Sequence, residues 1–172
     1  FTGLSCDNLQ GNGDILRQTV VSIARLSDPE LADWIYTKCS FPNSMVDCIV
    51  PATGPKELEL VKTFGIADAA PVTHENFRQW VIEDRFCAGR PDLEREGAIL
   101  TNDVHVYEAM KIRILNGGHQ LISNAGEVLS IKYIFDCMDH DLIGEFFRKV
   151  ARTEIAIQVA EVPGMTPAAY VD

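Results

Sequence analysis

The segment from Glu108 to Ser123 constrains the fold of this chain more than any other. Its sequence, EAMKIRILNGGHQLIS, has the spacing of apolar residues that is typical of a helix, yet polar side chains stand among them. At about 100° per residue these polar side chains share one face of the helix. They are Glu108, Lys111, Asn116 and His119. Because apolar residues occur on every face, the pattern predicts a helix that is buried nearly all round.

A lysine in such a helix is either paired or chemically active. Burial of an unpaired charge is unfavourable and lowers the pKa of a lysine, and a lowered pKa is what a lysine base requires. In the structural alternative, Lys111 pairs with Glu108 one turn earlier, while Asn116 and His119 are core polar groups with satisfied hydrogen bonds. The adjacent glycines Gly117–Gly118 cost about 1 kcal/mol each relative to alanine inside a helix. They therefore predict the close approach of a ligand or of another helix.

Near the start of the chain, a glycine-rich segment follows an extended one. Residues 1–8 have the pattern of the end of a buried strand that runs into a polar turn, which places Asn8 where ligands bind in open α/β sheets. Gly11–Gly13 contains a G-x-G, but the third glycine of a dinucleotide fingerprint is absent. We therefore predict that Asn12 is the N-cap of a helix beginning at Asp14, rather than part of a phosphate loop. The binding fingerprint of a nicotinamide cofactor would then lie outside this sequence.

Local signals predict the other elements and two domains. Periodicity, caps and Pro/Gly punctuation predict helices over 13–26, 29–38 and 55–64. They predict extended segments over 40–50, 71–75 and 79–84, and helix from Asp103 to about residue 160 with a break at 139–141. Trp34 and Ile35 are expected to pack inward. The predicted fold class is α/β followed by all-α, with one domain over residues 1–102 and a second over 103–172.

Composition excludes several kinds of partner. A net charge of -10 without any Lys/Arg cluster argues against nucleic acid and against an anionic membrane surface. No run of about 18 apolar residues and no signal-peptide pattern is present. Five cysteines without C-x2-C spacing indicate reduced thiols, a cytoplasmic location and no metal site. Because the chain starts at Phe1 without a methionine, we expect it to be an internal fragment whose remaining polypeptide is its main partner.

Several stretches together resemble one family. The K-x4-N-x2-H arrangement in MKIRILNGGHQ, with SCDNLQGNG, FPNSMVDCIVP, QWVIEDRFCAGRP and VPGMTPAAYVD in this order, is similar to the polyol-specific long-chain dehydrogenase/reductase family. This is the group of mannitol 2-dehydrogenases, arabinitol dehydrogenases and hexuronate reductases. The resemblance covers essentially the whole chain. It implies the C-terminal part of a Rossmann-like NAD(P)-binding domain joined to the start of a mainly helical catalytic domain.

The resemblance implies roles for the polar face of the helix. The family interconverts a polyol and a ketose by hydride transfer with NAD or NADP and without a metal. By the family pattern Lys111 is the general base in oxidation and the acid in reduction, Asn116 donates a hydrogen bond to the developing alkoxide, and His119 binds a substrate hydroxyl. The spacing of Glu108, one turn before Lys111, suggests a proton relay between solvent and the base.

The resemblance also implies roles for residues before the helix. Asn8 is a second amide donor and, with Lys111, lies close to the cofactor. The S-M-V-D segment lines the active site, which makes Val46 and Asp47 substrate neighbours. A fragment without its fingerprint is expected to be inactive alone. Two alternatives stay open, a hexuronate (fructuronate or tagaturonate) reductase of the same family and a non-catalytic acidic helical interaction module.

Overall fold

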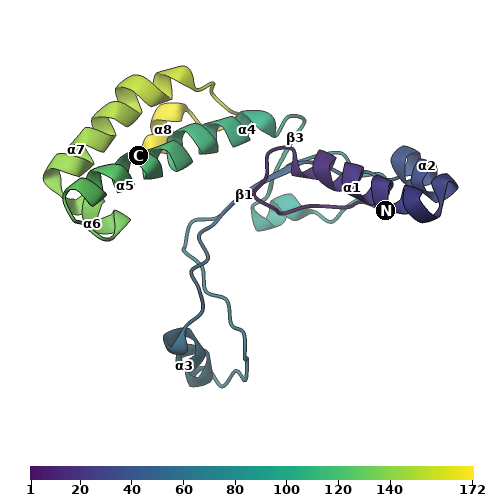
Figure 1. The fold of residues 1–172 in the computed structure, drawn as a ribbon, viewed down its shortest axis with the longest axis horizontal. Coiled ribbons are helices and arrows are strands. Elements are labelled where there is room, and N and C mark those ends of the chain that lie inside the picture. Colours follow the sequence, from purple (N-terminus) through teal and green to yellow (C-terminus); the bar gives the residue numbers. More distant parts are fainter. The chain divides into compact units, whose positions relative to one another are not determined.

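The computed structural model describes residues 1–172, which form two compact units, Phe1–Asn102 and Asp103–Asp172. Figure 1 shows their helices and strands. The N-terminal unit contains α1 (Asn12–Ser27), α2 (Pro29–Lys38), β1 (Ser44–Asp47), α3 (Pro55–Thr63), β2 (Gln79–Glu83), the 3-10 helix η1 (Leu93–Glu96) and β3 (Ile99–Thr101). None of the helices in the protein combines the length and the hydropathy that crossing a membrane requires.

The α1–α2 pair forms the helical part of the N-terminal unit. Its core is built from Ala24, Ala32, Ile35 and Phe41. The turn between the two helices follows the predicted pattern, because Asp28 accepts a hydrogen bond from the Leu31 N–H at 3.0 Å and Pro29 starts α2. Trp34 differs from the prediction, since it is 49% exposed while its neighbour Ile35 enters the core. One helical step of about 100° separates the two side chains, so α2 buries only one of them.

The sheet has three strands in the order β1-β2-β3. β2 pairs antiparallel with β1 and parallel with β3, with Val81 opposite both Met45 and Ile99. Both strands of the β1–β2 pair were predicted as extended segments, whereas the short strand β3 was not. The prediction of an extended segment over 71–75 is not borne out as a strand, because its Glu75 N–H donates to the Ile49 carbonyl at 3.1 Å without a ladder forming. Between β1 and β2 lies α3, which buries none of its residues and ends before Gly65 at φ 72°, as predicted.

The first residues do not form the buried strand that we predicted. Thr2 makes one isolated parallel bridge with Ser40, in which the Gly3 N–H donates to the Ser40 carbonyl at 2.9 Å. Phe1 is 55% exposed. A strand is buried only when neighbouring strands and a covering layer enclose it. The single neighbour found here leaves the segment at an edge.

The C-terminal unit consists of helices alone. It contains α4 (His105–Met110), the π-helix η2 (Lys111–Asn116), α5 (Gly117–Val128), α6 (Ile134–Asp139), α7 (Asp141–Val150), the π-helix η3 (Ala151–Ile155), the 3-10 helix η4 (Ala156–Gln158) and α8 (Pro167–Val171). The break near His140 was predicted. A second break, between α5 and α6, was not predicted. At this break the Ile131 N–H donates to the Gly126 carbonyl at 2.8 Å and ends α5. The N-cap of α4 is Val104, one residue after the expected start at Asp103, whose Oδ1 accepts from the His105 N–H at 2.9 Å.

The core of this unit explains one of the two adjacent glycines. Ile122, Cys137 and Ile143 form its centre, and Phe147 of α7 packs against them. A Cβ at Gly118 would lie 2.8 Å from the Phe147 ring, whereas Gly117 has no close side-chain neighbour. Of the two explanations for the glycine pair, the close approach of another helix therefore holds for Gly118.

Candidate functional site

Lys111 begins a π-helical turn in the middle of a longer helix. The side chain of Lys111 is buried, with the residue 6% exposed, and its neighbours Met110 and Ile114 are 2% exposed. In a π-helix each N–H bonds to the carbonyl five residues back, so side chains turn less per residue than in an α-helix. Such turns are frequent at functional sites. The one lysine predicted to be buried therefore lies at a backbone irregularity.

The π-turn changes which side chains share a face. Glu108 is buried at 4% exposed and His119 is half-buried, but Asn116 is exposed. Ile112 is also 45% exposed, so the prediction of a helix buried nearly all round is wrong. The 100° wheel assumes one hydrogen-bond register throughout, and the register shift between Lys111 and Asn116 breaks that assumption.

The hydrogen bond of His119 identifies which ring nitrogen carries the hydrogen. Its Nδ1 lies 2.9 Å from the carbonyl oxygen of Leu115 one turn earlier. Because a carbonyl oxygen only accepts, Nδ1 carries the hydrogen. In the neutral ring Nε2 then has a lone pair and can accept a hydrogen bond from a hydroxyl group.

Glu108 connects a buried position with an exposed one. Its Oε2 lies 2.8 Å from Nδ1 of His105, and the two side chains are 5% and 48% exposed respectively. On the adjacent position, Tyr107 is 3% exposed and its hydroxyl donates to the Pro163 carbonyl at 3.4 Å. Burial raises the pKa of the Tyr107 hydroxyl. Glu108 and Lys111 are thus buried one turn apart on the same helix.

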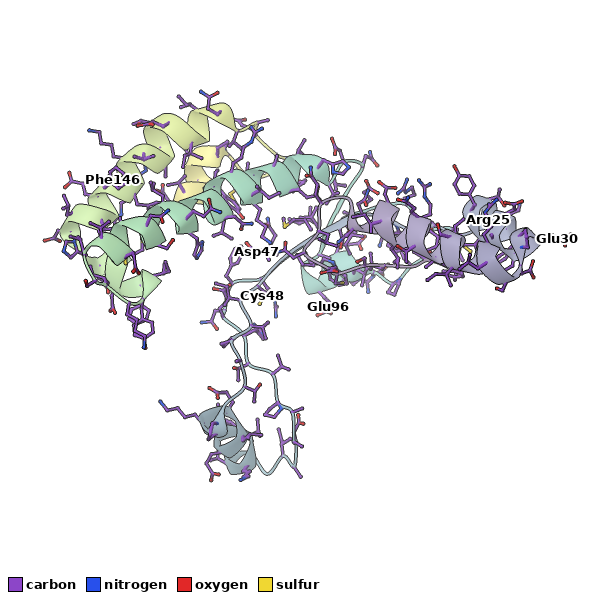
Figure 2. All side chains as sticks on the ribbon, viewed as in Figure 1. Arg25, Glu30, Asp47, Cys48, Glu96 and Phe146 are labelled. Carbon is purple, nitrogen blue, oxygen red and sulfur yellow. The ribbon has the colours of Figure 1, made fainter.

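In the N-terminal unit, Asp47 is the last residue of β1. It is 7% exposed and stands opposite Gln79, while Val46 is half-buried opposite Trp80 (Figure 2 labels Asp47). Asn8 lies exposed in the bend that precedes α1. A carboxylate buried at a strand end is unusual unless it interacts with other polar groups.

Asn12 ties the Asn8 bend to β1, a role that the sequence did not reveal. We predicted an N-cap, but Gly11 takes that position at φ 64° and Asn12 is 2% exposed. Its Oδ1 accepts from the Ser44 N–H at 2.9 Å, and its Nδ2 donates to the carbonyls of Ser44 at 2.9 Å and Asp7 at 2.8 Å. The neighbouring sequence does not reveal a partner that is 32 residues away. An asparagine at the start of a helix is equally compatible with an N-cap role.

The start of α1 is not built to hold a pyrophosphate. The Asp14 N–H donates to Asn43 Oδ1 at 3.0 Å, and the Asn43 amide donates in turn to the Asp14 carboxylate at 3.1 Å. A Cβ at Gly13 would lie 2.4 Å from the Pro42 carbonyl oxygen, so this glycine serves chain packing. The helix end meets a protein partner and carries its own carboxylate, both of which disfavour an anion. The prediction that a helix starts at this G-x-G is confirmed, although α1 begins at Asn12 and not at Asp14; that the segment binds no phosphate stays a prediction.

No group of three or more His, Cys, Asp or Glu side chains is arranged to hold a metal ion, and all five cysteines are free. The hydroxyl of Ser40, followed by that of Thr2, lowers the pKa of the Cys87 thiol to about 7. Cys87 is exposed.

Known proteins match nearly all of this chain. Residues 1–95 match the Rossmann domain of mannitol dehydrogenases, and residues 103–172 match the mannitol dehydrogenase C-terminal domain. The mannitol 2-dehydrogenase of Cereibacter sphaeroides is 55% identical over 95% of this chain and 34% of its own length, and that of Aspergillus terreus is 44% identical over 96% and 34%. The chain thus spans about a third of the length of these curated relatives.

Solved structures agree with the sequence matches. A Pseudomonas fluorescens mannitol 2-dehydrogenase in ternary complex with NAD and D-mannitol is 40% identical, with a TM-score of 0.81 over 99% of this chain and 35% of that one. A D-sorbitol dehydrogenase in substrate-free form is 34% identical, with a TM-score of 0.94 over 99% of this chain and 36% of that one. Because the two domain matches cover all but residues 96–102, the chain belongs to the mannitol dehydrogenase family.

Proposed function

We propose that this chain contributes to an oxidoreductase that interconverts a mannitol-like polyol and a ketose, with Lys111 as general base in oxidation and general acid in reduction. The observation that carries the proposal is the burial of Lys111 at the start of a π-helical turn. A lysine amine can exchange a proton with a substrate hydroxyl, and burial keeps bulk water from competing for that proton.

The neighbouring residues support roles in binding the substrate. His119 presents Nε2 as an acceptor because Nδ1 is committed to the Leu115 carbonyl. Exposed amides at Asn116 and Asn8 can donate to an oxygen on which negative charge develops. Asp47 and Val46, at the end of β1, are proposed to contact the polyol chain, and Asn8 and Lys111 to lie beside the cofactor.

A nicotinamide, of NAD or NADP, supplies hydride transfer when it is bound. The start of α1 does not fit its pyrophosphate, since Asn43 and the Asp14 carboxylate occupy that helix end. The chain's own part in the reaction is therefore proton transfer and substrate binding. We also propose that the boundary between the two domains lies at residues 102–103 and that catalysis needs no metal. The five free cysteines support a proposed cytoplasmic location.

The test is Lys111→Ala in the full-length protein, with Lys149→Ala as the control. Lys149 is an exposed lysine of α7 in the same unit, so its loss removes the same charge from the surface. We expect Lys111→Ala to lower kcat for polyol oxidation by about 10²- to 10⁴-fold and to leave NADH binding, followed by fluorescence titration, nearly unchanged. Near wild-type turnover would refute the role of Lys111.

The substrate panel separates the alternatives. Mannitol, arabinitol and a hexuronate are each supplied to the wild type with NAD(H) and NADP(H). Turnover of the hexuronate alone would assign the chain to a hexuronate reductase. Turnover of none of them, in a protein that is folded by circular dichroism, would favour the non-catalytic interaction module.

A further inference from the structure

The contact between His105 and Glu108 joins an exposed ring to a buried carboxylate. Nδ1 of His105 lies 2.8 Å from Oε2 of Glu108, and both residues belong to α4 at positions three apart. The His105 side chain is 48% exposed, whereas that of Glu108 is 5% exposed. An imidazole is the side chain best suited to exchange protons with water near neutral pH.

A hydrogen bond at the start of α4 orders the backbone of His105. Asp103 Oδ1 accepts the His105 backbone N–H at 2.9 Å, which orders the residue at the first turn of the helix. Glu108 then lies one turn further along the helix, and Lys111 one turn beyond Glu108. The three side chains run in sequence order from an exposed position to a buried one.

We infer that His105 is a positioning residue that orients the Glu108 carboxylate and carries protons between it and solvent. The inference rests on the proposed function. During polyol oxidation the hydroxyl proton passes to the Lys111 amine, and the resulting ammonium gives it to the Glu108 carboxylate. Because the ionised Glu108 carboxylate only accepts, His105 Nδ1 holds a hydrogen at rest. The ring exchanges this hydrogen through water for one on Nε2, Nδ1 then takes the proton from Glu108, and the imidazolium releases its Nε2 proton to water, which restores the resting tautomer. One proton leaves for each hydride removed, so the enzyme returns to its starting charge.

The experiment compares three variants of the full-length protein in a dilute buffer that contains no imidazole. His105→Ala removes the ring, and His105→Asn keeps a hydrogen-bonding group at the place of Nδ1 but cannot carry a proton. His140→Ala is the matched control, because His140 is exposed, lies in the same unit and makes no side-chain cap bond at α7. The readout is kcat for polyol oxidation as imidazole is added.

We expect kcat of His105→Ala and His105→Asn to fall by about tenfold, and to rise with imidazole concentration toward the wild-type value. Wild type and His140→Ala should show no imidazole dependence. Full turnover of His105→Asn without imidazole would reduce His105 to a structural role, and unchanged turnover of His105→Ala would refute both roles.

A second measurement separates this inference from the proposed function. Nitrogen-15 NMR of the histidine rings is recorded for wild type and Glu108→Gln. The His105 Nδ1 signal should move and the His140 signals should not. An unmoved His105 signal would overturn the inference whatever the activity. An inactive wild type with a moved signal would instead count against the proposed function and, with it, the proton path.

Discussion

Replacing Asn12 by alanine tests whether one buried side chain holds the Asn8 bend against β1. The substitution removes the acceptor of the Ser44 N–H and the donor to the carbonyls of Ser44 and Asp7. A buried polar group left without a partner costs about 1–3 kcal/mol. Ser44 loses partners for two such groups at a residue that is 2% exposed, whereas Asp7 is exposed and can turn to water. We therefore expect a loss of about 2–6 kcal/mol in the free energy of unfolding.

The measurement is urea unfolding of the 172-residue chain, followed by tryptophan fluorescence, since Trp80 pairs with Val46 of β1. Asn76→Ala is the control, because Asn76 is an exposed asparagine of the same unit and its loss should change stability by less than about 0.5 kcal/mol. The midpoint should shift for Asn12→Ala without a change in the m-value. A loss as small as that of the control would show that the Asn12 bonds do not join the two segments.

Three further predictions each rest on one structural feature. Gly118→Ala should destabilise the C-terminal unit by about 1–3 kcal/mol because its Cβ would meet Phe147 at 2.8 Å. Gly117→Ala should be neutral or stabilising by up to about 1 kcal/mol. Thermal unfolding of the two variants compares them, and equal effects would contradict the packing argument. Activity of the full-length protein should survive dialysis against a strong chelator, because no group of three ligating side chains is present; a loss restored by zinc would contradict it. The 172-residue chain alone should neither oxidise polyols nor bind NADH or NADPH tightly, because the start of α1 is occupied by Asn43; calorimetry showing micromolar binding would refute this.

Features that depend on residues close together in the chain were predictable from the sequence. Asp28-Pro29 between α1 and α2, and Gly65 after α3, act through the backbone of one turn, so their effect is readable locally. Hydrophobic spacing located the helices of the C-terminal unit and indicated that Lys111 would be buried. The ordered motifs carried the resemblance to the polyol dehydrogenases, and the domain matches bear out that family.

Contacts between distant residues, and the hydrogen-bond register of a helix, depend on how the elements pack and were not predictable from the sequence. The π-turn at Lys111 has no residue signature, because the choice between bonds four and five residues back depends on packing around the helix. For that reason the wheel misplaced Asn116, which is exposed. Asn12 was wrongly predicted as an N-cap because the same side-chain amide can either cap a helix or bond to Ser44. Ser44 lies 32 residues away in sequence and becomes the partner because β1 packs close to the start of α1. Local backbone preferences are worth about 1 kcal/mol or less per residue, so the burial of whole side chains, worth more, overrides them where the two disagree.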